Sequence, residues 1–136
     1  MRLRTVRLQG HDLVEAFDGA HRSDHATRFV GAHVRVLPGA RAAEIGCGTG
    51  VLSCLMARLG AGEVWAMDVD PAAVALADEG ARRNDLPQVR TVVGNLLDGV
   101  PADPPLDVVA AVMPQKPSPA AFSVAYAGGE DGADLL

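Results

Sequence analysis

Three glycines alternate with other residues directly after a glutamate in the segment EIGCGTG, residues 44–50. Glycine is used where a side chain would block a sharp turn or the close approach of a ligand to the backbone. Gly46 suits the turn, and Gly48 and Gly50 would let a ligand lie against the main chain. The spacing therefore predicts a loop that holds a small molecule through its backbone, with Glu44 beside it.

A second carboxylate, Asp68, ends the apolar segment EVWAMD, at about the distance of twenty residues at which nucleotide-binding folds place an acid. A carboxylate at the end of a strand can accept hydrogen bonds from both hydroxyl groups of a ribose. The loop and the acid together favour a ligand that contains a nucleoside. Nicotinamide dinucleotides and S-adenosylmethionine both meet this description.

The spacing of the glycines distinguishes these two ligands. Dinucleotide-binding loops read GxGxxG, whereas this chain reads GxGxG and carries Val51 where the third glycine would stand. A pyrophosphate also favours an electrically positive helix N-terminus, and Glu44 would make that neighbourhood more negative. The glutamate suits a ligand with a cationic end, such as the ammonium and sulfonium of S-adenosylmethionine. We therefore expect S-adenosylmethionine as the cofactor, with an NAD-dependent oxidoreductase as the less favoured alternative.

Alternating apolar strands and amphipathic helices predict the framework that positions these residues. The predicted strands are residues 41–45, 63–69, 89–94 and 106–113, and the predicted helices between the first three are residues 50–60 and 70–86. Asp70 suits the N-cap of the second helix and Pro71 its first turn. Strands that alternate with helices imply right-handed crossovers, and hence an α/β fold with a parallel sheet and helices on both faces.

The first 40 residues are predicted to lead into this core. Residues 1–10 could form a strand or an extended arm, and the apolar spacing in residues 11–37 predicts a helix that ends at Pro38 and Gly39. We expect a single domain over residues 1–136, with the lead-in over 1–40 and the core over 41–136.

Composition excludes several classes of function. The formal net charge is −5, which argues against a broad nucleic-acid footprint; we interpret the small cluster Arg2, Arg4 and Arg7 as a solvated edge. The spacing of Cys47 and Cys54 fits no zinc motif and no disulfide framework, so we expect no metal and a cytoplasmic protein. No apolar stretch approaches the length of a membrane span, and no membrane partner is expected.

Several segments resemble class I S-adenosylmethionine-dependent methyltransferases. EIGCGTG resembles their first motif, WAMDVDPAAVALA the segment that follows it, VVGNLLDGV their third-strand segment and LDVVAAVMP their fourth. RSDHATRFVGAHV is similar to the lead-in helix of the branch with protein-glutamine and ribosomal-protein methyltransferases, and YAGGEDGADLL to a glycine-rich stretch of its glutamine-methylating members. The resemblance covers about residues 21–136 and implies a Rossmann-like sheet with core strand order 3-2-1-4.

The resemblance also implies roles for the site residues. Glu44 would orient the loop and bind the methionine ammonium, directly or through water, and Asp68 would hold the ribose. Asn95 stands where the family usually has an aspartate that accepts from the adenine amino group, and an asparagine carbonyl can accept the same bond. The full set of cofactor-binding candidates is Glu44, Gly46, Cys47, Gly48, Gly50, Asp68, Val69, Asn95 and Leu96.

The acceptor site departs from the glutamine- and adenine-methylating relatives. Those relatives carry Asn-Pro-Pro-Tyr after the fourth strand, whereas this chain reads Val112, Met113, Pro114 and Gln115. Valine offers no amide to orient a nitrogen nucleophile, so we do not expect methylation of glutamine or adenine. Met113, Pro114 and Gln115 stay acceptor-site candidates for a small molecule or a protein.

Methyl transfer depends mainly on positioning, and a general base is needed only when the acceptor must lose a proton. His21, His25 and Lys116 are weak candidates for a base, so the catalytic residues are left unknown. We expect a methyltransferase; the alternative is a non-catalytic domain that binds S-adenosylmethionine or serves assembly.

The predicted core holds four of the seven strands of the full family fold. An uncovered fourth strand would present unpaired backbone groups along an apolar edge. We therefore expect a homo-oligomer through this edge. Two alternatives are that the chain is one piece of a longer protein and that it is a degenerate module without an acceptor pocket.

Overall fold

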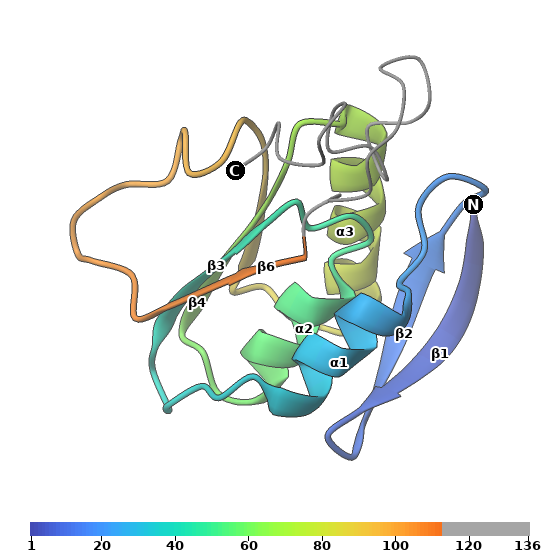
Figure 1. Ribbon diagram of the computed structural model, residues 1–136, viewed down its shortest axis with the longest axis horizontal. Helices are drawn as coiled ribbons and strands as arrows, with labels where there is room; N and C mark the ends of the chain where they lie inside the picture. The colour runs from blue at the N-terminus through green and yellow to red at the C-terminus, as the bar shows by residue number, and fades with distance from the viewer. Residues whose placement is uncertain (113–136) are drawn as a thin grey trace.

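The computed structural model describes residues 1–112 (Figure 1). The elements, in chain order, are β1 (Arg2–Leu8), β2 (His11–Phe17), α1 (His25–His33), β3 (Arg41–Ile45), α2 (Val51–Arg58), β4 (Glu63–Asp68), α3 (Pro71–Arg83), β5 (Val89–Val93) and β6 (Val108–Ala111). The strands form a four-stranded sheet and a separate two-stranded hairpin.

The larger sheet is parallel and has the order β5-β4-β3-β6, which confirms the predicted strand order. The chain moves outward from β3 through β4 to β5 and then returns to the other side of β3 with β6. In open parallel sheets, ligands bind at the carboxyl ends of the strands where the strand order reverses in this way. The loop that follows β3 therefore starts at the position where a ligand site is expected.

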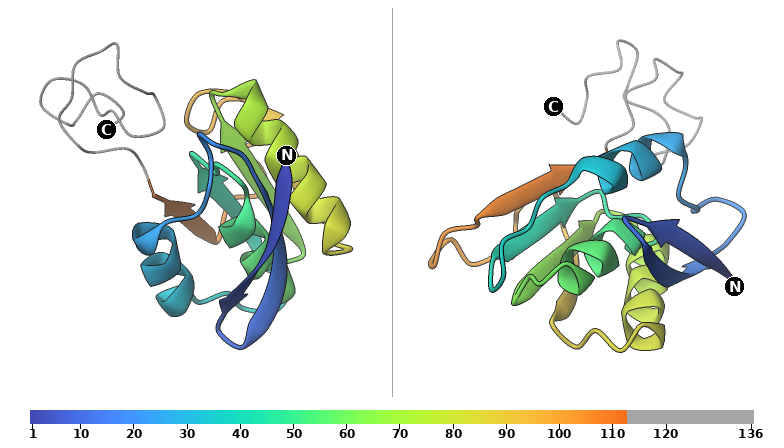
Figure 2. Two further views of the ribbon diagram at one scale, coloured as in Figure 1. Left: turned by 90° about the vertical axis from the view of Figure 1, so that its right-hand side faces the viewer. Right: turned by 90° about the horizontal axis from the view of Figure 1, so that it is seen from below.

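Helices α1, α2 and α3 lie on one side of this sheet in Figures 1 and 2, and the hairpin lies outside them. The prediction of helices on both faces therefore does not hold for residues 1–112, in which all three helices cover the same face. Ala42 of β3 and Val64 of β4 face the helices and are fully buried. On the opposite face Val109 of β6 is 49% exposed. Among residues 1–112, β6 pairs only with β3, and association through its other edge stays a prediction.

The N-terminal hairpin corrects the prediction of a helix over residues 11–37. Only His25–His33 form a helix, and His11–Phe17 form a strand antiparallel to β1. Gln9 and Gly10 make the two-residue turn with positive φ angles of 47° and 78°, which matches the right-handed twist of a hairpin. Strand β2 buries Leu13 and Ala16 completely, and this burial, with its contacts to α2 and α3, stabilises a strand over a helix.

Helix α2 lies between the sheet and the hairpin, and all its residues from Val51 to Ala57 are buried. The hairpin is fastened to α3 by Asn84, whose side-chain oxygen accepts from the Val14 N–H at 2.8 Å and whose amide nitrogen donates to the Val14 carbonyl at 2.8 Å. Asp70 caps α3 by accepting from the Ala72 N–H, with Pro71 in the first turn as predicted. In the part of the chain described, no helix is both long and apolar enough to span a membrane.

Candidate ligand-binding site

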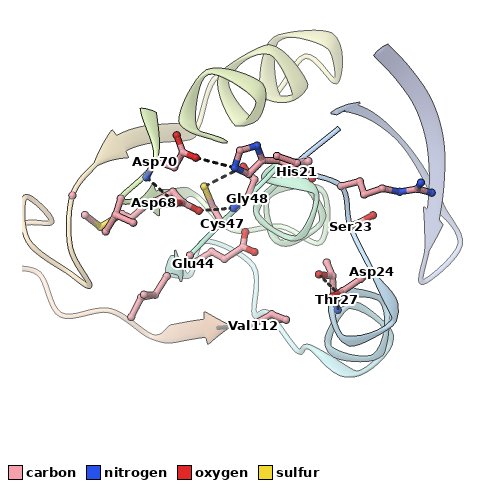
Figure 3. Close-up of a pocket in the computed structure, with 18 of the residues that line it drawn as sticks. His21, Ser23, Asp24, Thr27, Glu44, Cys47, Gly48, Asp68, Asp70 and Val112 are labelled. Atoms are coloured by element: carbon pink, nitrogen blue, oxygen red, sulfur yellow. Dashed lines mark hydrogen bonds and ion pairs between the residues drawn. The ribbon is translucent and has the colours of Figure 1, made fainter. Parts of the chain in front are cut away.

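A pocket opens at the carboxyl ends of β3, β4 and β5 (Figure 3). The segment of residues 18–24 forms its opposite wall, and residues 20–24 of this segment line the pocket. Eight of the nine predicted cofactor-binding residues line it: Glu44, Gly46, Cys47, Gly48, Asp68, Val69, Asn95 and Leu96. Residues from distant parts of the sequence complete the lining; among them are Ala20, His21, Arg22, Ser23, Asp24, Thr27 and Asp70.

The glycine loop has the conformation that its composition predicts. Gly46, Gly48 and Gly50 have φ angles of 67°, 53° and 72°, a region that residues with a side chain rarely adopt. A Cβ atom on Gly46 or Gly48 would meet no atom within 4 Å, so both backbones are open to a ligand.

Gly50 has a different role from the one expected. It does not line the pocket, and a Cβ atom there would lie 2.6 Å from the Cβ of Ala77 on α3. The missing side chain therefore allows α2 and α3 to pack closely at the start of α2, rather than allowing a ligand to approach.

Asp68 ties the two loops of the pocket together. Its Oδ2 accepts from the Gly48 N–H at 2.9 Å, and its Oδ1 accepts from the Asp70 N–H at 3.0 Å. Each carboxylate oxygen can accept a second hydrogen bond. Asp68 therefore holds the glycine loop in place and keeps acceptor capacity for the hydroxyl groups of a ligand.

Glu44 caps the first turn of α2. Its Oε2 accepts from the Ser53 N–H at 2.9 Å and from the Ser53 hydroxyl, while the N-cap residue, Gly50, has no side chain for this purpose. Burial raises the pKa of Glu44 to about 8, although the bonds from Ser53 oppose the shift and Asp68 adds to it. Glu44 is thus a mostly neutral carboxyl group at pH 7, not the fixed negative charge that the sequence suggested.

His21 bridges the two sides of the pocket mouth. Its Nε2 lies 3.0 Å from Oδ2 of Asp70 (Figure 3), and its Nδ1 lies 3.2 Å from Oδ1 of Asp18. Both ring nitrogens thus face carboxylates, so this arrangement leaves neither one free to act as a base. His25 lies outside the lining of this pocket, and Lys116 lies outside the described residues.

Two half-exposed apolar side chains mark the outer rim of the pocket. Val69 and Leu96 are each 43% exposed, and Asn95 lines the pocket beside Leu96. Apolar walls with a few polar groups are typical of sites for flat organic ligands. Of the acceptor region, Val112 lines the pocket, whereas Met113, Pro114 and Gln115 lie outside the described residues.

Sequence reasoning missed the wall formed by residues 18–24. The glycine loop and Asp68 carry local signals, because each follows a predicted strand. Ser23 and Asp24 reach the pocket only because β2 and α1 position the segment between them, and residues 11–37 were predicted to form one long helix instead. Over residues 1–112, no group of three or more histidine, cysteine, aspartate or glutamate side chains is placed to hold a metal ion.

Comparison with known families finds a match in sequence. The family described as ribosomal protein L11 methyltransferase (PrmA) matches residues 29–114. The ribosomal protein L11 methyltransferase of Pelotomaculum thermopropionicum is 40% identical over 104 residues, covering 67% of this chain and 33% of that protein. That of Acetivibrio thermocellus is 44% identical over 63 residues, covering 46% and 20%. The chain therefore spans a third or less of the length of these relatives.

Solved structures share the fold. The T. thermophilus 16S rRNA N2 G1207 methyltransferase, in complex with AdoMet and guanosine, has a TM-score of 0.68 at 19% identity over 88% of this chain and 34% of that one. A SAM-dependent methyltransferase from Thiobacillus denitrificans, in complex with S-adenosyl-L-homocysteine, has a TM-score of 0.54 at 24% identity, over 71% and 39%. These similarities confirm the predicted Rossmann-like methyltransferase fold.

Proposed function

Because this chain belongs to the ribosomal protein L11 methyltransferase family, we propose that its pocket binds S-adenosylmethionine and serves methyl transfer to a protein. The main support is that the open glycine loop, Glu44 and Asp68 line one pocket at the carboxyl ends of the parallel strands. Either feature alone would fit many nucleotide-binding folds.

The three parts of the cofactor would meet three different surfaces. The methionine end, with its ammonium, would lie over Gly46 and Gly48 and next to Glu44. The ribose hydroxyls would donate to Asp68, whose two oxygens each have one remaining lone pair. Adenine would lie against Val69 and Leu96 at the rim, which are apolar and partly exposed.

The pocket would act mainly by orientation. The sulfonium sulfur is a good leaving group, so a nucleophile with a free lone pair attacks the methyl carbon as the carbon–sulfur bond breaks and S-adenosylhomocysteine leaves. Alignment of the two reactants lowers such barriers by up to about 7–11 kcal/mol. The residues described here supply alignment, and we assign no catalytic base.

The family name favours a protein acceptor over a small metabolite, and a ribosomal protein as its class. The acceptor group of such a protein would approach from the side of Val112, which lines the pocket.

Calorimetric titration tests the cofactor, and transfer of a labelled methyl group tests the reaction. S-adenosylmethionine and S-adenosylhomocysteine should each bind at one site, and NAD should not bind. With a mixture of ribosomal proteins, label should move from the donor to a protein, with release of S-adenosylhomocysteine. Binding of NAD alone would overturn the proposal, and binding of the donor without any transfer would favour the non-catalytic alternative.

A further inference from the structure

Glu15 is a fully buried carboxylate in strand β2, away from the lining of the pocket. Its Oε1 accepts from the Ser23 N–H at 2.7 Å and from the Thr49 hydroxyl at 2.6 Å. Its Oε2 accepts from Nε of Arg4 at 2.5 Å and from the Ser23 hydroxyl at 3.1 Å. Four donors thus converge on one side chain.

These donors belong to separate walls of the pocket. Ser23 lies in the wall formed by residues 18–24, and Thr49 lies in the glycine loop; both line the pocket. Arg4 comes from β1 and also donates to the Ser23 carbonyl at 3.0 Å. Glu15 lies on the hairpin and outside the pocket lining. Its carboxylate therefore links Ser23 in one wall of the pocket to Thr49 in the facing wall.

The wall formed by residues 18–24 depends on such side-chain bonds. Within this segment the backbone makes one local hydrogen bond, from the Asp18 N–H to the His21 carbonyl. Its side-chain ties to the rest of the fold are the bonds of Ser23 to Glu15 and Arg4 at one end and the His21–Asp70 contact at the mouth. Without the bonds to Glu15, this segment would lose its tie to the glycine loop.

We propose that Glu15 is a positioning residue that holds Ser23 and Thr49 in the arrangement that receives S-adenosylmethionine. This inference rests on the proposed function. The physical basis is preorganisation: a wall that is ordered before binding does not have to be ordered by the ligand, so affinity is higher. The hairpin, which precedes the parallel sheet, is then part of the cofactor site.

The ionised state of Glu15 is essential to this role. Burial by itself would raise the pKa of Glu15, but the hydrogen bonds from Thr49, Arg4 and Ser23 outweigh it and hold the pKa below its ordinary value. An ionised carboxylate only accepts hydrogen bonds, and so it matches donors on both oxygens.

A glutamine cannot replace Glu15 in this network. Whichever way its amide is turned, the NH₂ group faces either the Ser23 N–H or Nε of Arg4, and neither of these groups can accept a hydrogen bond. We therefore expect Glu15→Gln to lower the affinity for S-adenosylhomocysteine by about tenfold or more, the scale of a lost charge-assisted bond.

Thr49 provides a test that leaves the buried charge in place. Thr49→Val keeps the shape and removes the hydroxyl, and we expect affinity to fall by about two- to tenfold. Thr49→Ser keeps the hydroxyl and should restore affinity to near that of the parent. Arg7→Gln is the matched control, because Arg7 forms an exposed ion pair with Asp12 on the same hairpin; its affinity should equal the parent's.

The experiment measures two quantities for each variant: the dissociation constant of S-adenosylhomocysteine by calorimetry, under conditions where the protein is folded, and the midpoint of thermal unfolding without ligand. If the parent binds no S-adenosylhomocysteine, the proposed function fails. If the parent binds and Thr49→Val binds equally well, with only the unfolding midpoints lowered, the network is merely structural and the inference is wrong. Weaker binding by Thr49→Val that Thr49→Ser restores supports it.

Discussion

Binding of S-adenosylmethionine is expected to release a proton from Glu44. With its pKa raised to about 8 by burial, this side chain is about nine-tenths protonated at pH 7 before the ligand binds. A ligand ammonium beside it favours the ionised form and lowers the pKa of Glu44 again. Nearly one proton should therefore leave for each ligand bound at pH 7.

The same linkage predicts how affinity varies with pH. If Glu44 is ionised in the complex, only the ionised fraction of the free protein is competent to bind. That fraction rises from about 1% at pH 6 to about 9% at pH 7 for a pKa of about 8. The association constant should therefore increase about ninefold across this interval, because the ligand ammonium itself changes little there.

Calorimetry in buffers of different ionisation enthalpy measures the proton release directly. The observed binding enthalpy at pH 7 should vary linearly with the buffer's ionisation enthalpy, with a slope near one proton. Glu44→Gln, which still offers Ser53 an oxygen acceptor, should abolish the Glu44-dependent part of the slope and the increase in affinity between pH 6 and 7. Equal slopes for the parent and Glu44→Gln would refute the reasoning.

Stability without ligand should show the opposite dependence on pH. The pKa of Glu44 is higher in the folded state than in the unfolded chain, so the folded state binds the proton more tightly. The resulting contribution is fully present below about pH 4.5 and is lost as the pH rises through about 8. Urea unfolding of the parent and Glu44→Gln across this range should show that only the parent carries this decline.

Four further substitutions probe other parts of the site and its support. Asp68→Ala should weaken binding of S-adenosylhomocysteine by about 1.5–3 kcal/mol in calorimetry, the range for hydrogen bonds to a charged group. Gly50→Ala should lower the free energy of unfolding by about 1–3 kcal/mol, because φ is 72° and the new methyl collides with α3; Gly46→Ala, which meets no atom, should be the milder change in the same urea titration. Asn84→Ala should cost about 1–3 kcal/mol in that assay, since it leaves two partly buried backbone groups of Val14 without their partner.

The parallel core could be predicted because its signals are local. Each strand is an apolar run, Asp70 and Pro71 mark the start of α3, and the alternating glycines have the positive φ angles that their composition suggests. The strand order followed from the family resemblance. That Glu44 lies beside the glycine loop was also predicted, and it lines the pocket. Its protonation state was not predicted, because burial and the distance to Asp68 exist only in the folded chain.

The hairpin could not be predicted in the same way. Its turn has Gln9 at the first central position, where asparagine, aspartate or glycine is the usual signal. Its buried residues Leu13, Glu15 and Ala16 do not alternate strictly, because the strand contacts α2 and α3 on one side and the glycine loop at its end. A buried glutamate in a short apolar segment gave no hint of its partners.

The contact between Val14 and Asn84 spans 70 residues of sequence, and this separation sets an order of events during synthesis. The ribosome adds about 5–20 residues per second, so the hairpin is made roughly 4–14 seconds before its anchor on α3. A lone two-stranded hairpin is only marginally stable in water. The nascent hairpin should therefore stay undocked through that interval, and the ligand pocket should take shape only after α3 has emerged.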